Sequence, residues 1–354
     1  MLISEEERSG LPPELHRAAG IPLQSGLYNE IRQRGCNLST YLEELDPSPA
    51  DAALDAFERQ LALAGIKVIG EDASIIDRFF ATQENAVLFP EFVARSVRIG
   101  KDDFTKLGKT IAGRTRVDDN TYKAIYMDDS VLSESDKRLA KVAEGAALPK
   151  IEIESAEHTI QLHKYGRYLE ATYEAIRRKR VNVVALFLRA IGVQIQRDKF
   201  TDAVGVVING DGNDNAASVV NTATSGTLTY ADLVNFKLSF DPYEMNVILV
   251  SQTMAKNILG LSEFKEPLVA GEFQRTGQMI KLFGAEMIVD DAVATDRIVG
   301  LDRRFAIEEV YETDVITESE HLIRQQIEGT AISEVAGFAK LIKSASKVLD
   351  TSWA

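Results

Sequence analysis

A long helical segment between residues 170 and 207 restricts the folds open to this chain more than any other feature. A helix of roughly 35 residues would extend about 50 Å, because each residue adds about 1.5 Å, and a small globular domain needs no helix of that length. Gly210 and Gly212 predict where it ends. The apolar side chains that recur at helical spacing are Ile176, Val183, Val184, Phe187, Leu188, Ile191, Ile195, Phe200 and Val204. We therefore expect a spine helix.

Residues 1–99 predict an extended N-terminal arm. Glycine or proline interrupts the apolar patterns of this stretch at Gly10, Pro12, Pro13, Gly20, Pro22, Gly26, Gly35, Pro47 and Pro49. One helix is expected from Ala50 to Ala64, and Gly65 would end it. Such an arm buries little of its own apolar surface. Its apolar side chains should pack on the body of the chain or on a neighbouring subunit: Leu23, Leu27, Tyr28, Ile31, Phe79 and Phe80.

Residues 100–165 predict a long two-stranded projection. Lys109–Val117 and Thr121–Met127 have strand-like composition, and the polar residues 118–120 between them suit a hairpin turn. A charged excursion follows from Asp128 to Pro149, and alternation returns from Lys150 to Leu162. An isolated ribbon is only marginally stable in water, so this projection should lie across another surface.

The last third of the chain predicts a mixed α/β region followed by strands. Helices are expected at Thr229–Leu238, with Thr229 as N-cap, and at Ser251–Leu261. The buried strands expected here are Asn246–Val250, Leu282–Val289 and Arg297–Leu301. The later strand-like runs, separated by polar breaks, are Ala306–Tyr311, the surroundings of Ile316, His321–Ile327 and Val335–Ile342.

Charge and cysteine content exclude several classes of protein. The net charge of −14 opposes tight nucleic-acid binding, which needs basic residues to displace phosphate counterions. Cys36 is the only cysteine, so no intrachain disulfide can form and a reducing cytoplasm is expected. The acidic start of the sequence is not a signal peptide. The most apolar stretch of the whole sequence, Val181–Ile195, is too short and too polar to span a bilayer.

No sequence motif predicts catalysis, a cofactor or a metal. Gly108-Lys109-Thr110 lacks the earlier glycine of a phosphate-binding loop. Residues 211–215 resemble the start of a calcium loop, but Ala216 and Thr222 replace its required glycine and glutamate. The four histidines show no zinc-site spacing. We expect a protein that is not an enzyme.

Exposed basic residues are the candidates for contacts between subunits. The densest cluster is residues 177–180, which lacks the interleaved aromatic residues of a nucleic-acid patch and could instead pair with acidic residues of another copy. The candidates are Arg114, Arg116, Lys123, Lys137, Arg138, Lys141, Arg177, Arg178, Lys179, Arg180, Arg303 and Arg304.

The order of these segments resembles the Hong Kong 97-type capsid fold of tailed double-stranded DNA phages. The resemblance covers roughly residues 85–345 and rests on three passages: Tyr168–Gly212, Lys281–Val289, and Ile323–Gly329 with Val335–Lys340. It implies an α+β fold with an N-terminal arm (1–99), an E-loop projection (100–165), a peripheral domain with the spine helix (166–227), an axial domain (228–301) and peripheral return strands (302–354).

The same resemblance implies a structural function. Such subunits form hexamers and pentamers that close into an icosahedral shell by head-to-tail contacts. Partners would be other copies of the chain, a scaffolding protein, a portal, a possible decoration protein and weakly contacted double-stranded DNA, with no membrane. Assembly would occur in the host cytoplasm, and the virion would be the final location.

The sequence departs from the family pattern in two ways, which concern covalent cross-linking of the shell and removal of the N-terminal segment. Some relatives join a lysine of the E-loop to an asparagine of the peripheral domain, but this sequence has no asparagine after Asn257. We therefore expect a shell without covalent cross-links. Residues 1–90 lack a long coiled-coil segment, so we expect the arm to be retained and scaffolding to come from another protein.

Three other functions fit the sequence less well. An encapsulin, a cellular nanocompartment shell with the same fold, would enclose enzymes rather than DNA. A soluble α/β enzyme built on residues 228–301 would need a pocket with converging polar groups. A tail or adaptor protein would form rings instead of shells.

Overall fold

The chain divides into two compact units that interleave along the sequence. The computed structural model describes residues 15, 17–24, 26–34, 36–126, 144, 154–155, 158–172, 178–265, 281–322 and 327–353. Unit 1 comprises Met1–Asp103, Gly166–Ile195 and Val315–Ser333. Unit 2 comprises Phe104–Tyr165, Gln196–Asp314 and Glu334–Ala354.

Between residues 15 and 103, the described part of the chain is folded largely as short helices of unit 1, so the expectation of an extended arm is wrong for these residues. The elements are η2 (Ala18–Gly20), α2 (Leu27–Arg34), α3 (Leu38–Leu45), α4 (Ala56–Leu63), η3 (Ile76–Phe80) and α5 (Gln83–Asp103). Leu27, Ile31 and Phe79 are buried within this unit. The glycines and prolines separate short helices here instead of keeping the chain extended.

Helix α4 shows how the local sequence determines where these short helices begin and end. Asp55 caps its N-terminus in a reciprocal capping box with Glu58, so the helix begins later than the predicted Ala50. Gly65 ends it, as predicted, with a positive φ of 66° that most residues avoid. Asp55 also accepts a 3.0 Å hydrogen bond from Arg95 of α5, which fixes α4 against that helix.

Aromatic side chains fill the core of unit 1 beneath α5. The ring of Phe79 lies 5.6 Å from that of Phe89 and 5.2 Å from that of Phe92, in edge-on and tilted arrangements that aromatic pairs favour. Phe80 packs on Phe89 at 5.2 Å. Of the two alternatives predicted for Phe79 and Phe80, the body of the chain or a neighbouring subunit, the structure shows packing within their own unit.

The predicted spine helix is α7 (Val181–Asn209), a single helix of 29 residues. It is shorter than expected because residues 163–172 form strand β6 (His163–Thr172) instead. Its end agrees with the prediction. Gly210 has a φ of 82°, and a Cβ atom there would lie 2.6 Å from the side chain of Asn215, so only glycine permits this exit.

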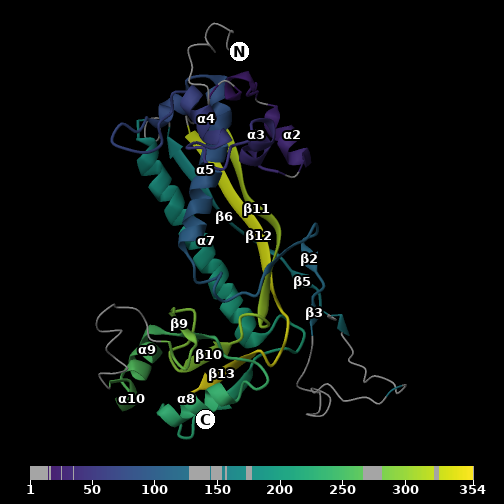
Figure 1. Cartoon of the computed structure of the whole chain (residues 1–354), viewed down its shortest axis with the longest axis vertical. Coiled ribbons are helices and arrows are strands. Elements are labelled where there is room, and N and C mark those ends of the chain that lie inside the picture. The colour runs from purple at the N-terminus through teal and green to yellow at the C-terminus, as the bar shows by residue number, and fades with distance from the viewer. Residues whose placement is uncertain are drawn as a thin grey trace. The chain divides into compact units, whose positions relative to one another are not determined.

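Within unit 1, α5 and the first half of α7 lie side by side in backbone contact (Figure 1). A Cβ atom at Gly100 would lie 2.0 Å from the carbonyl oxygen of Arg189, and one at Gly192 would lie 2.1 Å from that of Val97. Each helix thus supplies a glycine where the other comes closest. This contact explains a glycine in the middle of a long helix, where it otherwise costs stability.

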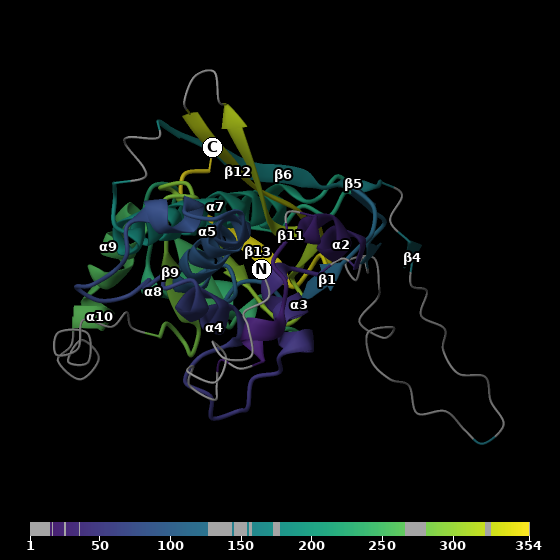
Figure 2. The same cartoon turned by 90° about the horizontal axis from the view of Figure 1, so that it is seen from above.

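A four-stranded sheet has the order β1-β11-β12-β6. Its long strands, β11 (Ile307–Leu322) and β12 (Ile327–Lys340), run side by side in both views (Figures 1 and 2). They are continuous where polar breaks were expected. The predicted hairpin across residues 118–120 is wrong, because β1 (Arg114–Arg116) pairs in parallel with β11, with Arg114 opposite Glu309.

The predicted ribbon is present in its described residues. Strand β2 (Thr121–Tyr122) pairs antiparallel with β5 (Ile160–Gln161), and β3 (Ile125–Tyr126) pairs antiparallel with β4 (Glu154–Ser155). Most of the predicted charged excursion, Asp128–Pro149, lies outside the described residues. The pairing joins Thr121–Met127 with Lys150–Leu162, as the alternation of those segments predicted.

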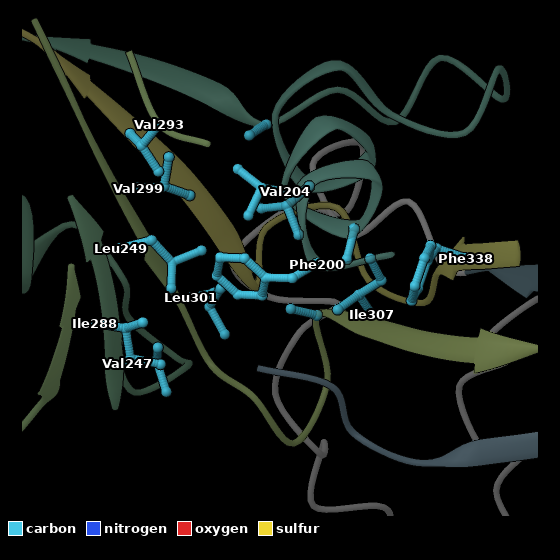
Figure 3. Packing of buried hydrophobic residues seen from close by; sticks show 14 of the residues in the cluster. Phe200, Val204, Val247, Leu249, Ile288, Val293, Val299, Leu301, Ile307 and Phe338 are labelled. Atoms are coloured by element: carbon cyan, nitrogen blue, oxygen red, sulfur yellow. The ribbon is translucent and has the colours of Figure 1, made fainter. Parts of the chain in front are cut away.

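The remaining strands of unit 2 form a five-stranded sheet in the order β7-β13-β10-β8-β9. Its strands are β7 (Ser218–Asn221), β8 (Val247–Val250), β9 (Glu286–Val289), β10 (Arg297–Leu301) and β13 (Ser346–Asp350), and its helices are α8 (Tyr230–Leu238), α9 (Gln252–Leu259) and α10 (Ser262–Lys265). Thr229 and Ser251 cap α8 and α9. Figure 3 shows Phe200 and Val204 of α7 packed towards Leu249, Val299 and Leu301 of this sheet.

Replacing Gly192 with alanine should destabilise the protein. The new methyl group must displace the backbone of α5, and overpacking of this kind costs about 1–3 kcal/mol, occasionally more. Gly205→Ala is the matched control in the same helix, since nothing lies within 4 Å of a Cβ atom there. It should gain up to about 1 kcal/mol from helix propensity. Thermal unfolding of both variants measures the difference, and equal melting temperatures would contradict the backbone contact.

Candidate assembly surface

A fully buried ionic network joins α7 to the two long strands within unit 2. The ammonium group of Lys199 contacts the carboxylates of Glu309 on β11 and Glu334 on β12, and all three side chains are at most 1% exposed. Removing charges from water costs several kcal/mol for each ion, which only close partners can offset. The network therefore fixes the position of α7 on this sheet.

Arg114 connects this buried network to the surface. Its guanidinium Nε lies 3.1 Å from Glu309, and the group stacks 4.7 Å from the ring of Tyr311. Arg114 was predicted as a candidate for contacts between subunits. In this structure it is half-exposed and pairs within its own chain, where it supplies a second positive charge to the two buried carboxylates.

Arg304 is likewise paired within the chain, whereas Arg303 has an exposed side chain. Arg304 forms two hydrogen bonds with Asp302, at 2.9 and 2.8 Å. Burial opposes ionisation of Asp302, but donation from Arg304, the Glu244 amide and Asn246 outweighs it and holds the pKa of that carboxyl below its ordinary value. Arg304 thus stabilises the turn between β10 and β11.

Most of the other described basic candidates are exposed. Arg116 lies on β1, and Lys123 lies between β2 and β3. Arg178 and Lys179 precede α7 directly, and Arg180 donates a hydrogen bond to the carbonyl oxygen of Glu71. Four candidates lie outside the described residues: Lys137, Arg138, Lys141 and Arg177. The structure thus gathers Arg178–Arg180 at the start of α7 and leaves Arg116 and Lys123 on other elements.

An exposed apolar stripe on α7 was missed by the sequence reasoning. Val183, Leu186 and Phe187 are 41%, 63% and 69% exposed. Val183 and Phe187 are two of the apolar residues whose helical spacing predicted this helix. Helix α7 is apolar on nearly all sides, so spacing alone does not distinguish its packed face from its open one. We name the stripe formed by Val183, Leu186, Phe187, Ala190 and Val193 the α7 face.

The loops that resemble ligand motifs use their polar groups internally. Asp211 accepts hydrogen bonds from Asn213 and from the amide of Lys340. Lys109 pairs with Glu286 at 2.6 Å. No group of three or more metal-ligating side chains occurs among the described residues, and none of the described helices is long and apolar enough to cross a membrane.

An open groove of about 690 Å³ lies over β5, β6, α7 and β12 in unit 2. Its polar side chains include Tyr165 and Asp202, which bond to each other at 2.6 Å. Burial and the Asp202 carboxylate raise the pKa of the Tyr165 hydroxyl, so it stays protonated as the donor. The two side chains that line the groove here are therefore hydrogen-bonded to each other.

Comparison with known families decides the class of this protein. A family model described as phage capsid protein matches residues 155–339, more than half of the chain. The chain belongs to the phage capsid protein family. The match runs from the last residue of β4 to the penultimate residue of β12, so it includes all of α7 and the three buried ionic residues.

Two solved shells have the same fold as this capsid protein. A virus-like particle protein from Pyrococcus furiosus is 10% identical, with a TM-score of 0.51 over 74% of this chain and 99% of that one. The capsid of a native GTA particle is 14% identical, with a TM-score of 0.53 over 69% and 89%. No curated protein sequence matches significantly.

These comparisons confirm the predicted Hong Kong 97-type capsid fold and the shell function. The protein is a mixed helix-and-sheet subunit of a phage capsid, and its family implies a structural role and a place in the virion. The match to a phage capsid family favours a viral shell over the nanocompartment alternative. The basic candidate residues and the four named domains stay predictions.

Removing the buried cation should destabilise this capsid protein strongly. Lys199→Met leaves the carboxylates of Glu309 and Glu334 buried without the cation between them, and breaking a buried pair costs about 3–5 kcal/mol. The matched control is Arg34→Met, because Arg34 and Glu30 form an exposed pair worth at most about 1 kcal/mol. Chemical unfolding gives the free energy of unfolding of both variants. If Lys199→Met lowers it no more than Arg34→Met does, the buried network does not stabilise the fold as proposed.

Lys340 should make stability depend on pH. Burial lowers its pKa from 10.5 to about 7, although the nearby Asp211 carboxylate partly counters the effect. Between about pH 7 and pH 10 the unfolded chain therefore binds more protons than the folded one, so stability rises with pH in that window. Below about pH 7 both states are protonated and the contribution is constant.

The measurement is the unfolding free energy of the wild type minus that of Lys340→Met, taken from pH 6 to pH 10. The difference should be flat up to about pH 7 and then rise in favour of the wild type. Lys256→Met removes an exposed lysine of α9 and serves as the control. A Lys340 difference that stays flat or falls above pH 7 would show that this amine keeps its proton in the folded state.

Proposed function

We propose that this capsid protein forms hexamers and pentamers that close into an icosahedral shell around double-stranded DNA, and that it catalyses no reaction. The family match carries the proposal. The buried frame of α7, β11 and β12 supports it, because a shell subunit must hold its shape while its neighbours bind it. Many modest contacts acting together then make the shell nearly irreversible.

The charge balance supports weak contact with the packaged DNA. A net charge of −14 leaves few positions that could release phosphate counterions, and counterion release supplies most of non-specific affinity. Weak adhesion suits a container that is filled and later emptied. A scaffolding protein, a portal and possibly a decoration protein complete the proposed partners, with assembly in the host cytoplasm.

The ribbon is the proposed E-loop, which lies on a neighbouring subunit. Its described strands form only two short pairs, β2 with β5 and β3 with β4, and an isolated ribbon of this kind is marginally stable. Residues 1–99 are the proposed N-terminal domain in place of an extended arm, and residues 166–227 with 302–354 and residues 228–301 are the proposed peripheral and axial domains. The exposed basic residues Arg116, Lys123, Arg178, Lys179 and Arg303 are proposed to pair with acidic residues of other copies.

Electron microscopy of the purified full chain tests this function. Negative-stain images should show closed shells or hexamer rings. Replacing residues 127–153 with Asn-Gly should leave a folded protein with an unchanged melting temperature but abolish both assemblies, because the clasp on the neighbour is lost. Ile69→Ser, at an exposed site of unit 1, is the control and should assemble. A wild-type chain that stays monomeric at high concentration would refute the shell function.

A further inference from the structure

The root of the ribbon, residues 117–124 and 158–162, is attached to the body of unit 2 through both of its strands. The outgoing strand leaves β11 at Val117, whose amide donates a 2.9 Å hydrogen bond to a carbonyl oxygen of β11. The two strands of the root are joined by the β2–β5 pair and by a 2.9 Å hydrogen bond from the Leu162 amide to the Asn120 carbonyl oxygen. The described root is therefore one piece, and its attachment determines the direction in which the ribbon leaves the unit.

Small residues of β12 form a seat for this root. Gly337 and Ala339 lie two positions apart on β12 and so belong to the same face of the sheet. A Cβ atom at Gly337 would lie 2.8 Å from Cδ2 of Leu162, so the glycine leaves room for this leucine of the root. The buried apolar cluster beside it consists of Ala124, Ile160, Val310 and Ala339. Lifting the root from the sheet would expose these side chains to water, which the hydrophobic effect opposes.

A chain of polar contacts ties the returning strand of the root to the exit loop of α7 (residues 210–216). Asn213 in this loop accepts a 2.8 Å hydrogen bond at Oδ1 from the His158 amide. Its Nδ2 donates at 2.8 Å to Asp211, whose other carboxylate oxygen accepts a 3.0 Å hydrogen bond from the Lys340 amide. Asn213 is only 7% exposed. A buried amide that lost this acceptor would be left without a replacement from water, which costs free energy.

We propose that this root holds the ribbon in a fixed direction before a neighbouring subunit binds, and that Asn213 is a positioning residue for the ribbon. The anchors lie on three separate elements: β11, β12 and the exit loop of α7. A single anchor would act as a hinge, whereas three restrain both tilt and rotation. This inference rests on the proposed function, in which the ribbon clasps a neighbour.

A fixed direction strengthens each contact that the ribbon makes in the shell. Ordering a flexible segment on binding costs free energy, and a segment that is already held in its bound direction avoids much of that cost. The gain recurs at every copy, because each subunit clasps a neighbour through its own ribbon. Asn213 thus acts on assembly through the root and not by touching the neighbour.

A distance measurement on the unassembled subunit tests the fixed direction. Spin labels at Ser155→Cys on β4 and Lys256→Cys on α9, in dilute full-length Cys36→Ser protein, report on the ribbon beyond the root. The wild-type root should give one narrow distance distribution, and Asn213→Ala should broaden it. Thr222→Ala, which removes another buried side-chain hydrogen bond of unit 2, is the matched control and should leave the distribution narrow. A broad distribution with the wild-type root, or no broadening in Asn213→Ala, would overturn the proposal.

Gly337→Ala tests the seat through a different contact. The new methyl group should displace Leu162 and broaden the same distance distribution. Leu162→Val lacks the Cδ2 atom that the methyl group would meet, so the double variant should return towards the narrow distribution. A single variant as narrow as the wild type, or a double variant as broad as the single one, would contradict the role of the seat.

Light scattering during assembly separates this inference from the shell function. Asn213→Ala should need a protein concentration about tenfold or more higher than Thr222→Ala to form shells, because every clasp must then be ordered on binding. Both variants are compared at the same interval below their own melting temperatures, so a general loss of stability does not produce the difference. Equal concentrations would show that Asn213 does not position the clasp. If the wild-type chain forms no shell, the proposed function fails, while the distance measurement still decides whether the root is fixed.

Discussion

The contact of Lys199 with Glu309 and Glu334 is the interaction on which the frame of unit 2 depends. A lone charge at this depth would be prohibitively costly, so each of the three residues requires the other two. They belong to α7, β11 and β12, three elements far apart in the sequence. Apolar contacts alone would allow a helix to shift along a sheet at little cost in free energy. A shift of α7 would separate the buried ion pairs, so these pairs oppose it.

Helix α7 needs such fixing because its first half, Val181–Ile195, is apolar on most sides. In unit 1 the approach to α5 is set by backbone contact at Gly100 and Gly192. In unit 2 its position is set by Lys199 and by the packing of Phe200 and Val204 on the five-stranded sheet. What these contacts leave uncovered is the α7 face. A single helix thus provides both internal support and an exposed apolar surface.

Many polar groups of the described residues are used within the chain, and the role that the family implies is structural. Polar groups that a ligand site would present are satisfied internally, as in the Tyr165–Asp202 and Lys109–Glu286 pairs. Two of the predicted basic contacts, Arg114 and Arg304, are also used within the chain. The residues that stay exposed include the apolar α7 face and several of the basic candidates. Those are the groups that self-assembly requires.

The sequence by itself determined the elements whose cause is local. The exit of α7 at Gly210, the caps at Thr229 and Ser251, and the buried strand at Val247–Val250 depend on neighbours along the chain, and their order was enough to identify the capsid fold. Tertiary structure decided the rest. The described residues between 15 and 103 fold largely as helices because many of their apolar side chains are buried within unit 1. Contacts between residues that are distant in sequence determine three further features: the parallel pairing of β1 with β11, the buried Lys199 network and the exposed side of α7. The spacing of residue types along the chain does not indicate which distant residues will be in contact.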